Sequence, residues 1–130
     1  MVSHRLKFSV VSGSFAVSRL AAGAAIPDWI RSGTFSCVTR TSDELSVVSL
    51  AASIPAEVQS EKGWACLKLQ GPFPFQLTGI LASFLDPLAQ AGIPIFAVST
   101  FDTDYILVKD EHKERTLAAL IEAGHELTVA

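Results

Sequence analysis

The sequence lacks the features that mark several classes of protein. Among its 130 residues, 10 lysines and arginines face 13 aspartates and glutamates, which gives a net charge of −3. A protein that neutralises several phosphates carries a basic excess, so nucleic acid is not an expected partner. The chain has only two cysteines, Cys37 and Cys66, and their spacing matches no metal or redox motif. We expect both thiols to be buried in a reducing cytoplasm.

Long hydrophobic runs are also missing. No segment approaches the roughly 18 consecutive apolar residues of a membrane-spanning helix, and no apolar stretch follows Arg5 and Lys7 as in a signal peptide. We therefore expect a cytoplasmic protein that does not associate with a membrane.

The residues needed for catalysis are not grouped in the sequence. The three histidines, His4, His112 and His125, are scattered along the chain, and none forms a recognised metal-ligand spacing with the cysteines. We expect ordinary surface or helix-capping roles for them. The predictions are that the protein is not an enzyme and that it holds neither a metal ion nor a cofactor.

What the sequence does contain is apolar material, with 49% hydrophobic and 18% charged residues. A chain of this size fits one ordinary domain or two very small modules. We expect it to bury a core and to leave an apolar surface that a second subunit covers.

The second half of the sequence has a regular order of predicted elements. Residues 64–70 alternate as a strand does, and the apolar spacing from Leu77 to Leu88 predicts a helix that Gly92 ends, with a kink or a changed last turn at Pro87. Residues 93–99 read as a fully buried strand, and a tight turn leads into a strand over 104–109. A helix over 112–123, with Leu117, Leu120 and Ile121 on its buried face, and a short strand complete a β-α-β-β-α-β order, which is ferredoxin-like.

The first half looks like a degenerate copy of the same plan. A shift of 60 positions aligns residues 38–48 with residues 98–108, so that a strand, an acidic turn and a strand recur. Upstream, residues 6–11 and 15–20 read as two strands about a turn at Ser12–Ser14. The segment 26–33 is a candidate first helix and residues 55–62 a vestigial second helix.

The segment LTGILASFLDPLAQAGIPIF, residues 77–96, resembles the ACT-domain family, whose small ferredoxin-like modules bind amino acids and regulate metabolic enzymes. More narrowly, about residues 34–127 resemble short bacterial proteins with two tandem ACT modules, which are related to the arginine-sensing ACT proteins of animals. The resemblance implies an α+β fold of two ferredoxin-like ACT modules with antiparallel sheets side by side. We assign the degenerate first module to residues 1–61 and the ACT domain to residues 62–130.

In that family the amino acid sits between the two modules, and the chemistry of the residues agrees. Backbone N–H groups at the helix start, around Thr78, Gly79 and Ile80, would favour the ligand carboxylate. Asp102 or Asp104 could hold its ammonium group, although either could equally shape the turn or be solvated. The resemblance adds further ligand-binding candidates: Thr100, Phe101, the backbone groups of Ile93 and Ile95, and Ser46 and Val47 from the first module.

These observations predict a non-catalytic regulatory protein that binds a free amino acid and forms a homodimer. Its target is expected to be a separate enzyme or other protein. The alternative is an interaction or dimerisation module that binds no ligand.

Overall fold

The computed structural model describes residues 4–74 and 76–129. The chain divides into two compact units, unit 1 (residues 1–11 and 65–130) and unit 2 (residues 12–64). Two long strands, β1 (Lys7–Leu20) and β4 (Ser60–Leu69), contribute to both units. Unit 2 is therefore an insertion within unit 1, and this differs from the predicted division into 1–61 and 62–130. Residues 4–11 belong with unit 1 because Leu6 and Phe8 are part of its core.

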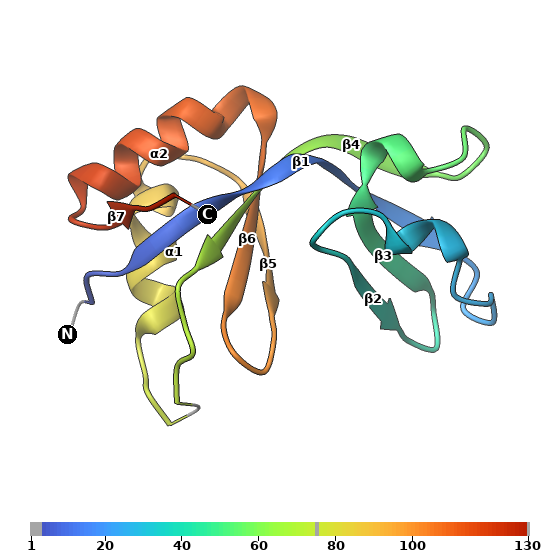
Figure 1. Ribbon diagram of the computed structural model, residues 1–130, viewed down its shortest axis with the longest axis horizontal. Helices are drawn as coiled ribbons and strands as arrows, with labels where there is room; N and C mark the ends of the chain where they lie inside the picture. Colours follow the sequence, from blue (N-terminus) through green and yellow to red (C-terminus); the bar gives the residue numbers. More distant parts are fainter. Residues whose placement is uncertain (1–3, 75, 130) are drawn as a thin grey trace. The chain divides into compact units, whose positions relative to one another are not determined.

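Unit 1 has the strand order β1-β4-β6-β5, with β5 spanning Ile95–Ser99 and β6 spanning Asp104–Lys109 (Figure 1). The short β7 (Glu126–Leu127) pairs in parallel with β1. Two helices complete the unit, α1 (Ile80–Gln90) and α2 (Lys113–Glu122), and a 3-10 turn at Asp110–His112 precedes α2. The predicted β-α-β-β-α-β order of the second half is thus confirmed, and unit 1 has a small α+β, ferredoxin-like fold.

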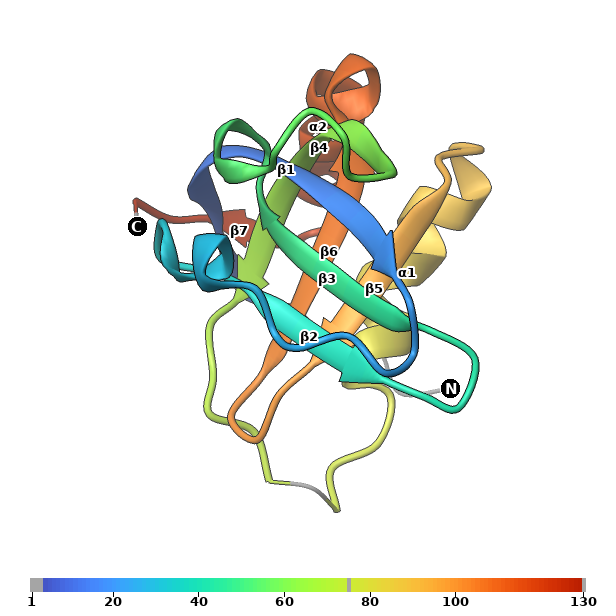
Figure 2. The same ribbon diagram turned by 90° about the vertical axis from the view of Figure 1, so that its right-hand side faces the viewer.

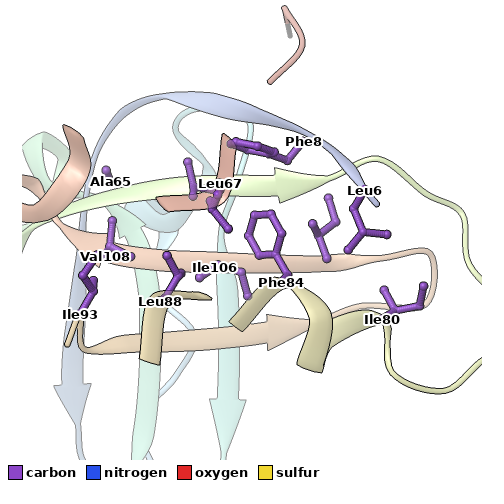
Figure 3. Close-up of a cluster of buried hydrophobic side chains, with 12 residues drawn as sticks. Leu6, Phe8, Ala65, Leu67, Ile80, Phe84, Leu88, Ile93, Ile106 and Val108 are labelled. Carbon is purple, nitrogen blue, oxygen red and sulfur yellow. The ribbon is translucent and has the colours of Figure 1, made fainter. Parts of the chain in front are cut away.

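The core of unit 1 joins the helices to the sheet (Figure 3). Phe84 of α1 lies at its centre and contacts Phe8 of β1 edge to face, with ring centroids 5.3 Å apart. Leu67 of β4, Ile106 of β6 and Leu120 of α2 complete the buried layer. Large aromatic and aliphatic side chains that are removed from water in this way supply most of the stabilisation of a domain.

Unit 2 has the strand order β2-β3-β1-β4, with β2 at Cys37–Arg40 and β3 at Leu45–Leu50 (Figure 2). The antiparallel pairs β2–β3 and β1–β3 confirm the predicted hairpin over residues 38–48. Written in reverse as β5-β6-β4-β1, the strand order of unit 1 corresponds to this order position by position. In unit 1, β1 then takes the position that β4 has in unit 2. Residues 12–64 contain no α-helix, only the 3-10 helices η1 (Asp28–Arg31) and η2 (Ala51–Ser53).

Several predictions for the first half are wrong in detail. Residues 7–20 form one continuous strand without a turn, because Gly13 makes room for Leu50: a Cβ at Gly13 would lie 2.6 Å from a Leu50 methyl group. The candidate helix over 26–33 is reduced to η1. Residues 55–62 form no helix, since η2 ends before Pro55 and β4 begins at Ser60.

Other corrections concern unit 1. Strand β5 is only half-buried, because it is the last strand in the order and pairs with β6 alone. As predicted, helix α1 runs through Pro87, and it continues to Gln90. Leu77, three residues before α1, is 44% exposed, and Ile121 on α2 is 52% exposed. Among the described residues no helix is long and apolar enough to cross a membrane.

Helix α1 ends as predicted at Gly92, which has a φ of 71°. The Gly92 N–H donates to the Ala89 carbonyl and the Ile93 N–H to the Leu88 carbonyl, both at 3.0 Å. This pair of bonds is the Schellman motif, in which a left-handed residue satisfies the last carbonyls of the helix. It fixes the direction in which the chain enters β5.

His125 is 5% exposed, so the expected surface or capping role is wrong for this histidine. Its Nδ1 accepts the Leu6 N–H at 3.1 Å, and its Nε2 donates to the Ser83 carbonyl at 2.9 Å. Its ring also lies against Phe84, at a centroid distance of 5.3 Å. One imidazole therefore joins the end of α2, the middle of α1 and the start of β1.

The two thiols differ in environment. Cys66 on β4 is fully buried, as predicted, whereas Cys37 on β2 is half-buried. Burial raises the pKa of the Cys66 thiol to about 12, because the low-dielectric core disfavours the thiolate.

We predict that a thiol reagent such as DTNB at pH 8 modifies only Cys37 in the folded protein, because the Cys66 thiolate is both scarce and enclosed. In guanidinium chloride both thiols should react. The count of thionitrobenzoate released per chain measures this directly. Rapid release of two equivalents from the folded protein would contradict the placement of Cys66.

We predict that His125→Ala lowers the free energy of unfolding by about 2–4 kcal/mol, because it leaves the buried Leu6 N–H without an acceptor and opens a cavity. His125→Asn keeps an acceptor near the position of Nδ1 and should lose clearly less. His112→Ala, on a half-buried histidine that contacts only Arg115 through its ring, is the matched control and should change little. Urea unfolding measures all three, and equal effects of the Ala and Asn variants at His125 would contradict the bridging role.

Candidate functional site

Unit 1 contains a cavity of about 320 Å³ where the loop after β4, the start of α1 and the β5–β6 turn meet. We call it the loop–turn cavity. Its lining residues come from three segments: Phe73, Pro74 and Leu77 of the loop, Gly79, Ile80, Leu81 and Ala82 of the helix start, and Ser99, Thr100, Phe101, Asp102, Thr103 and Asp104 of the turn.

The start of α1, Gly79 to Ala82, lines this cavity. Gly79 is the N-cap residue and has a φ of 80°, a left-handed conformation that glycine adopts without strain. Its carbonyl accepts the Ser83 N–H at 2.9 Å, and no side chain caps the helix. The N–H groups of the first helical turn, from Ile80 to Ala82, have no partner within the helix. This helix end therefore favours an anionic group.

Two threonines hold the β5–β6 turn. The Thr100 N–H and hydroxyl both donate to the Thr103 carbonyl, at 2.8 and 3.0 Å, and the Thr103 N–H donates back to the Thr100 hydroxyl at 3.2 Å. The Thr103 hydroxyl donates to the Leu69 carbonyl of β4 at 2.8 Å. Because the threonines fix the turn, Asp102 is not needed to shape it with its side chain.

The two aspartates of the turn are in different situations. Asp104 Oδ1 accepts the Ser99 hydroxyl at 2.5 Å, across the register pair that joins the ends of β5 and β6. Asp102 is exposed, and within the described part of the chain its carboxylate accepts no hydrogen bond. Asp102 is therefore the carboxylate that a ligand can reach without breaking an existing contact.

The loop and the turn are tied together through the backbone. The Phe73 N–H donates to the Asp102 carbonyl at 3.0 Å. Gly71 lies so close that a Cβ there would be 2.7 Å from the Asp102 carbonyl oxygen and 3.0 Å from Thr103 Cβ. The two walls of the loop–turn cavity thus cannot move independently.

The charge around the loop–turn cavity is of one sign. Asp102 and Asp104 are its only charged lining residues in the described structure, and no lysine, arginine or histidine lines it. The turn therefore favours a positively charged group, and the start of α1 favours a negatively charged one. No group of three or more His, Cys, Asp or Glu side chains suited to a metal ion occurs among the described residues.

The structure brings together six of the residues predicted from the sequence. The following predicted residues line the loop–turn cavity: Gly79, Ile80, Thr100, Phe101, Asp102 and Asp104. Thr78 precedes the helix and does not line it; its carbonyl contacts His4 Nε2 at 3.0 Å.

Four predicted residues lie elsewhere. Ile93 is buried and does not line the loop–turn cavity, and its N–H donates to the Leu88 carbonyl at the end of α1, so its backbone contact with a ligand stays a prediction. Ile95 pairs with Val108 at the end of β5 away from the turn. Ser46 and Val47 belong to β3 of unit 2, where the Val47 side chain is fully buried. A contribution of Ser46 to a ligand site stays a prediction.

Sequence reasoning missed part of the apolar lining. Phe73, Leu77 and Leu81 form it, yet each looked like a core or helix-stripe residue in the sequence. Thr103 was missed as well, because nothing in a single sequence distinguishes a threonine that anchors a turn from one that faces solvent. The repeated proline–phenylalanine pattern of residues 72–75 was the one available signal.

Comparisons with known proteins agree with the fold. A family model described as ACT domain matches residues 59–122, and a second model, described as an N-terminal domain, matches residues 13–57. Two solved structures share the fold at low sequence identity. A Vibrio cholerae protein described as of unknown function and a possible transport protein is 21% identical, with a TM-score of 0.74 over 92% of this chain and 90% of that one. The regulatory subunit of aspartate kinase from Thermus thermophilus is 13% identical, with a TM-score of 0.55 over 85% of this chain and 93% of that one.

A third structure is much more similar. The crystal structure of an Agrobacterium tumefaciens protein is 46% identical to this chain and superimposes with a TM-score of 0.92. The match covers 98% of this chain and 96% of that one. The chain therefore belongs to the same family as the Agrobacterium tumefaciens protein, and its residues 59–122 form an ACT domain.

Proposed function

We propose that this chain is a cytoplasmic, non-catalytic regulatory protein that binds a free amino acid in the loop–turn cavity. The observation that carries the proposal is the meeting, in one cavity of an ACT domain, of unpaired helix N–H groups and an unengaged carboxylate. An α-amino acid has the complementary pair of charges on adjacent atoms.

The two ends of the loop–turn cavity bind different groups of the ligand. The ligand carboxylate accepts from the first-turn N–H groups of α1, which also carry the positive end of the helix dipole. The ligand ammonium donates to Asp102 in a charge-assisted hydrogen bond. The volume of about 320 Å³ lies at the small end of the range for ligand sites, as a single amino acid requires.

The turn connects the loop–turn cavity to a strand with which another chain can pair, and this connection provides the route for regulation. The turn is continuous with β5, whose outer edge pairs with no other described strand. A ligand that bridges α1 and the turn would stiffen the end of this edge strand, and an exposed edge is a surface on which another chain can pair. The fold shared with the regulatory subunit of an aspartate kinase supports a regulatory role of this kind. We propose that the protein acts as a homodimer on a separate target.

We infer a degenerate second ACT-like module in unit 2. Its strand order corresponds to that of unit 1, while η1 and η2 stand where the two helices of a complete module would be. The ligand proposal needs only residues of unit 1.

The alternative is an interaction module that binds no ligand. The half-buried β5 edge favours it, because an apolar edge strand is itself a pairing site. In that case the loop–turn cavity would be a surface hollow without an occupant.

The first test is a thermal-shift screen against the twenty amino acids. A ligand at about 100 times its dissociation constant should add about 2.7 kcal/mol of stability, which raises the melting temperature by several degrees. Asp102→Asn should abolish the shift, because it removes the partner of the ammonium. Asp43→Asn, at an exposed turn residue of unit 2, is the control and should preserve it. If no amino acid shifts the wild type at millimolar concentration, the alternative replaces this proposal.

A second prediction concerns the shape of the loop–turn cavity. Gly71→Ala places a methyl group against the Asp102 carbonyl, so the turn must move away from the loop and the affinity for the amino acid should fall at least about 10-fold. Gly23→Ala is the matched control, because nothing lies within 4 Å of the added Cβ. Isothermal titration of both variants measures the affinities. Unchanged binding by Gly71→Ala would show that the ligand does not depend on the contact between loop and turn.

A further inference from the structure

We propose that the bound amino acid has an uncharged, apolar side chain, and that Phe101 and Leu77 are the residues that select it. This inference rests on the proposed function and goes further, because it names the class of ligand. It is carried by the exposure of two large side chains at the loop–turn cavity and by the charges of the lining.

Phe101 and Leu77 are unusually exposed for their size. Phe101 at the tip of the β5–β6 turn is 80% exposed, and Leu77 in the loop is 44% exposed. Among the large hydrophobic side chains exposed in the described part of the chain, these two line the same cavity. When an apolar partner covers exposed apolar groups at a concave site, the complex is stabilised because apolar surface is removed from water.

The apolar surface continues inward. Phe73 of the loop and Leu81 of α1 are half-buried, pack against the core of unit 1 and also line the loop–turn cavity. An aliphatic or aromatic ligand side chain would therefore contact hydrocarbon on the loop side and the helix side. A charged side chain in the same place would lose hydration without a partner, which is costly.

The charges of the lining oppose an acidic side chain and leave only Asp104 for a basic one. No basic residue lines the cavity, so the carboxylate of an acidic amino acid would face Asp102 and Asp104. A basic side chain would need a second free carboxylate, since Asp102 is used by the ligand ammonium. Asp104 already accepts the Ser99 hydroxyl. An apolar side chain needs no charged partner and is covered by the hydrocarbon of Phe73, Leu77, Leu81 and Phe101.

The test compares three amino acids of similar length by isothermal titration with the full chain. Norleucine and lysine share the same four-carbon stem and differ by the ε-ammonium group, and glutamate supplies the acidic case. We expect norleucine to bind at least about 10-fold more tightly than lysine, with no detectable binding of glutamate. Equal or tighter binding of lysine or glutamate overturns this inference and leaves the proposed function intact. Failure of all three, and of the twenty-amino-acid screen, overturns both.

Variants of Phe101 test whether this residue selects the side chain of the ligand. Phe101→Ala should weaken norleucine binding about 10-fold and leave glycine binding unchanged, because glycine has no side chain for Phe101 to contact. Phe101→Leu should restore most of the affinity. Ile121→Ala removes a side chain of similar exposure on α2 and is the control. If Phe101→Ala affects glycine and norleucine equally, or affects neither, Phe101 does not select the side chain.

Discussion

Strand β1, near the start of the chain, completes the sheet of unit 1, and the rest of unit 1 depends on this contact. Leu6 and Phe8 fill the core beneath α1, and the Gln70 N–H donates to the Lys7 carbonyl at 2.9 Å. His125 accepts the Leu6 N–H from the other side. Unit 1 therefore cannot form from residues 65–130 alone, because its core would lose two large side chains and expose the flank of β4.

This constraint explains why the chain has an inserted unit instead of two units in succession. Residues 4–11 pack with residues 65–130 in unit 1. The neighbouring strands β1 and β4 therefore both continue from unit 1 into unit 2. Contacts so distant in sequence are entropically expensive to form and are repaid only by the packing they create. The sequence does show the high apolar content that such packing needs.

The loop–turn cavity depends on the same sheet indirectly, because its turn and loop are anchored to β4. Thr103 anchors the turn to Leu69 at the end of β4, and Phe73 anchors the loop to the turn. These anchors hold the backbone of the cavity, so a ligand has little backbone to order, although the exposed side chains of Leu77, Phe101 and Asp102 still lose rotamer freedom. A site held in this way binds with a smaller entropic cost than one whose walls must first be ordered.

The sequence predicted the local elements of unit 1 because each carried a complete signal. The apolar spacing from Ile80 to Leu88 and the glycine at position 92 suffice to place α1 and its end. The pairing of β1 with unit 1 could not be predicted, because residues 6–11 look like any half-buried strand and nothing in their composition names a partner. Asp102 could be recognised as a candidate by its charge, whereas Phe101 came to the candidate list through a family resemblance. Its apolar role depends on exposure, which only the fold reveals.

The relation between the cavity and the β5 edge connects the two functions that the sequence left open. The turn that carries Asp102 is the end of the strand whose edge is free in the described structure. In the proposed function, ligand binding and chain pairing would both act on this hairpin, and by thermodynamic linkage each would change the affinity of the other if the hairpin differed between the two states. A regulatory protein needs this coupling. A pure dimerisation module would gain nothing from an unengaged carboxylate and an exposed phenylalanine beside its pairing edge.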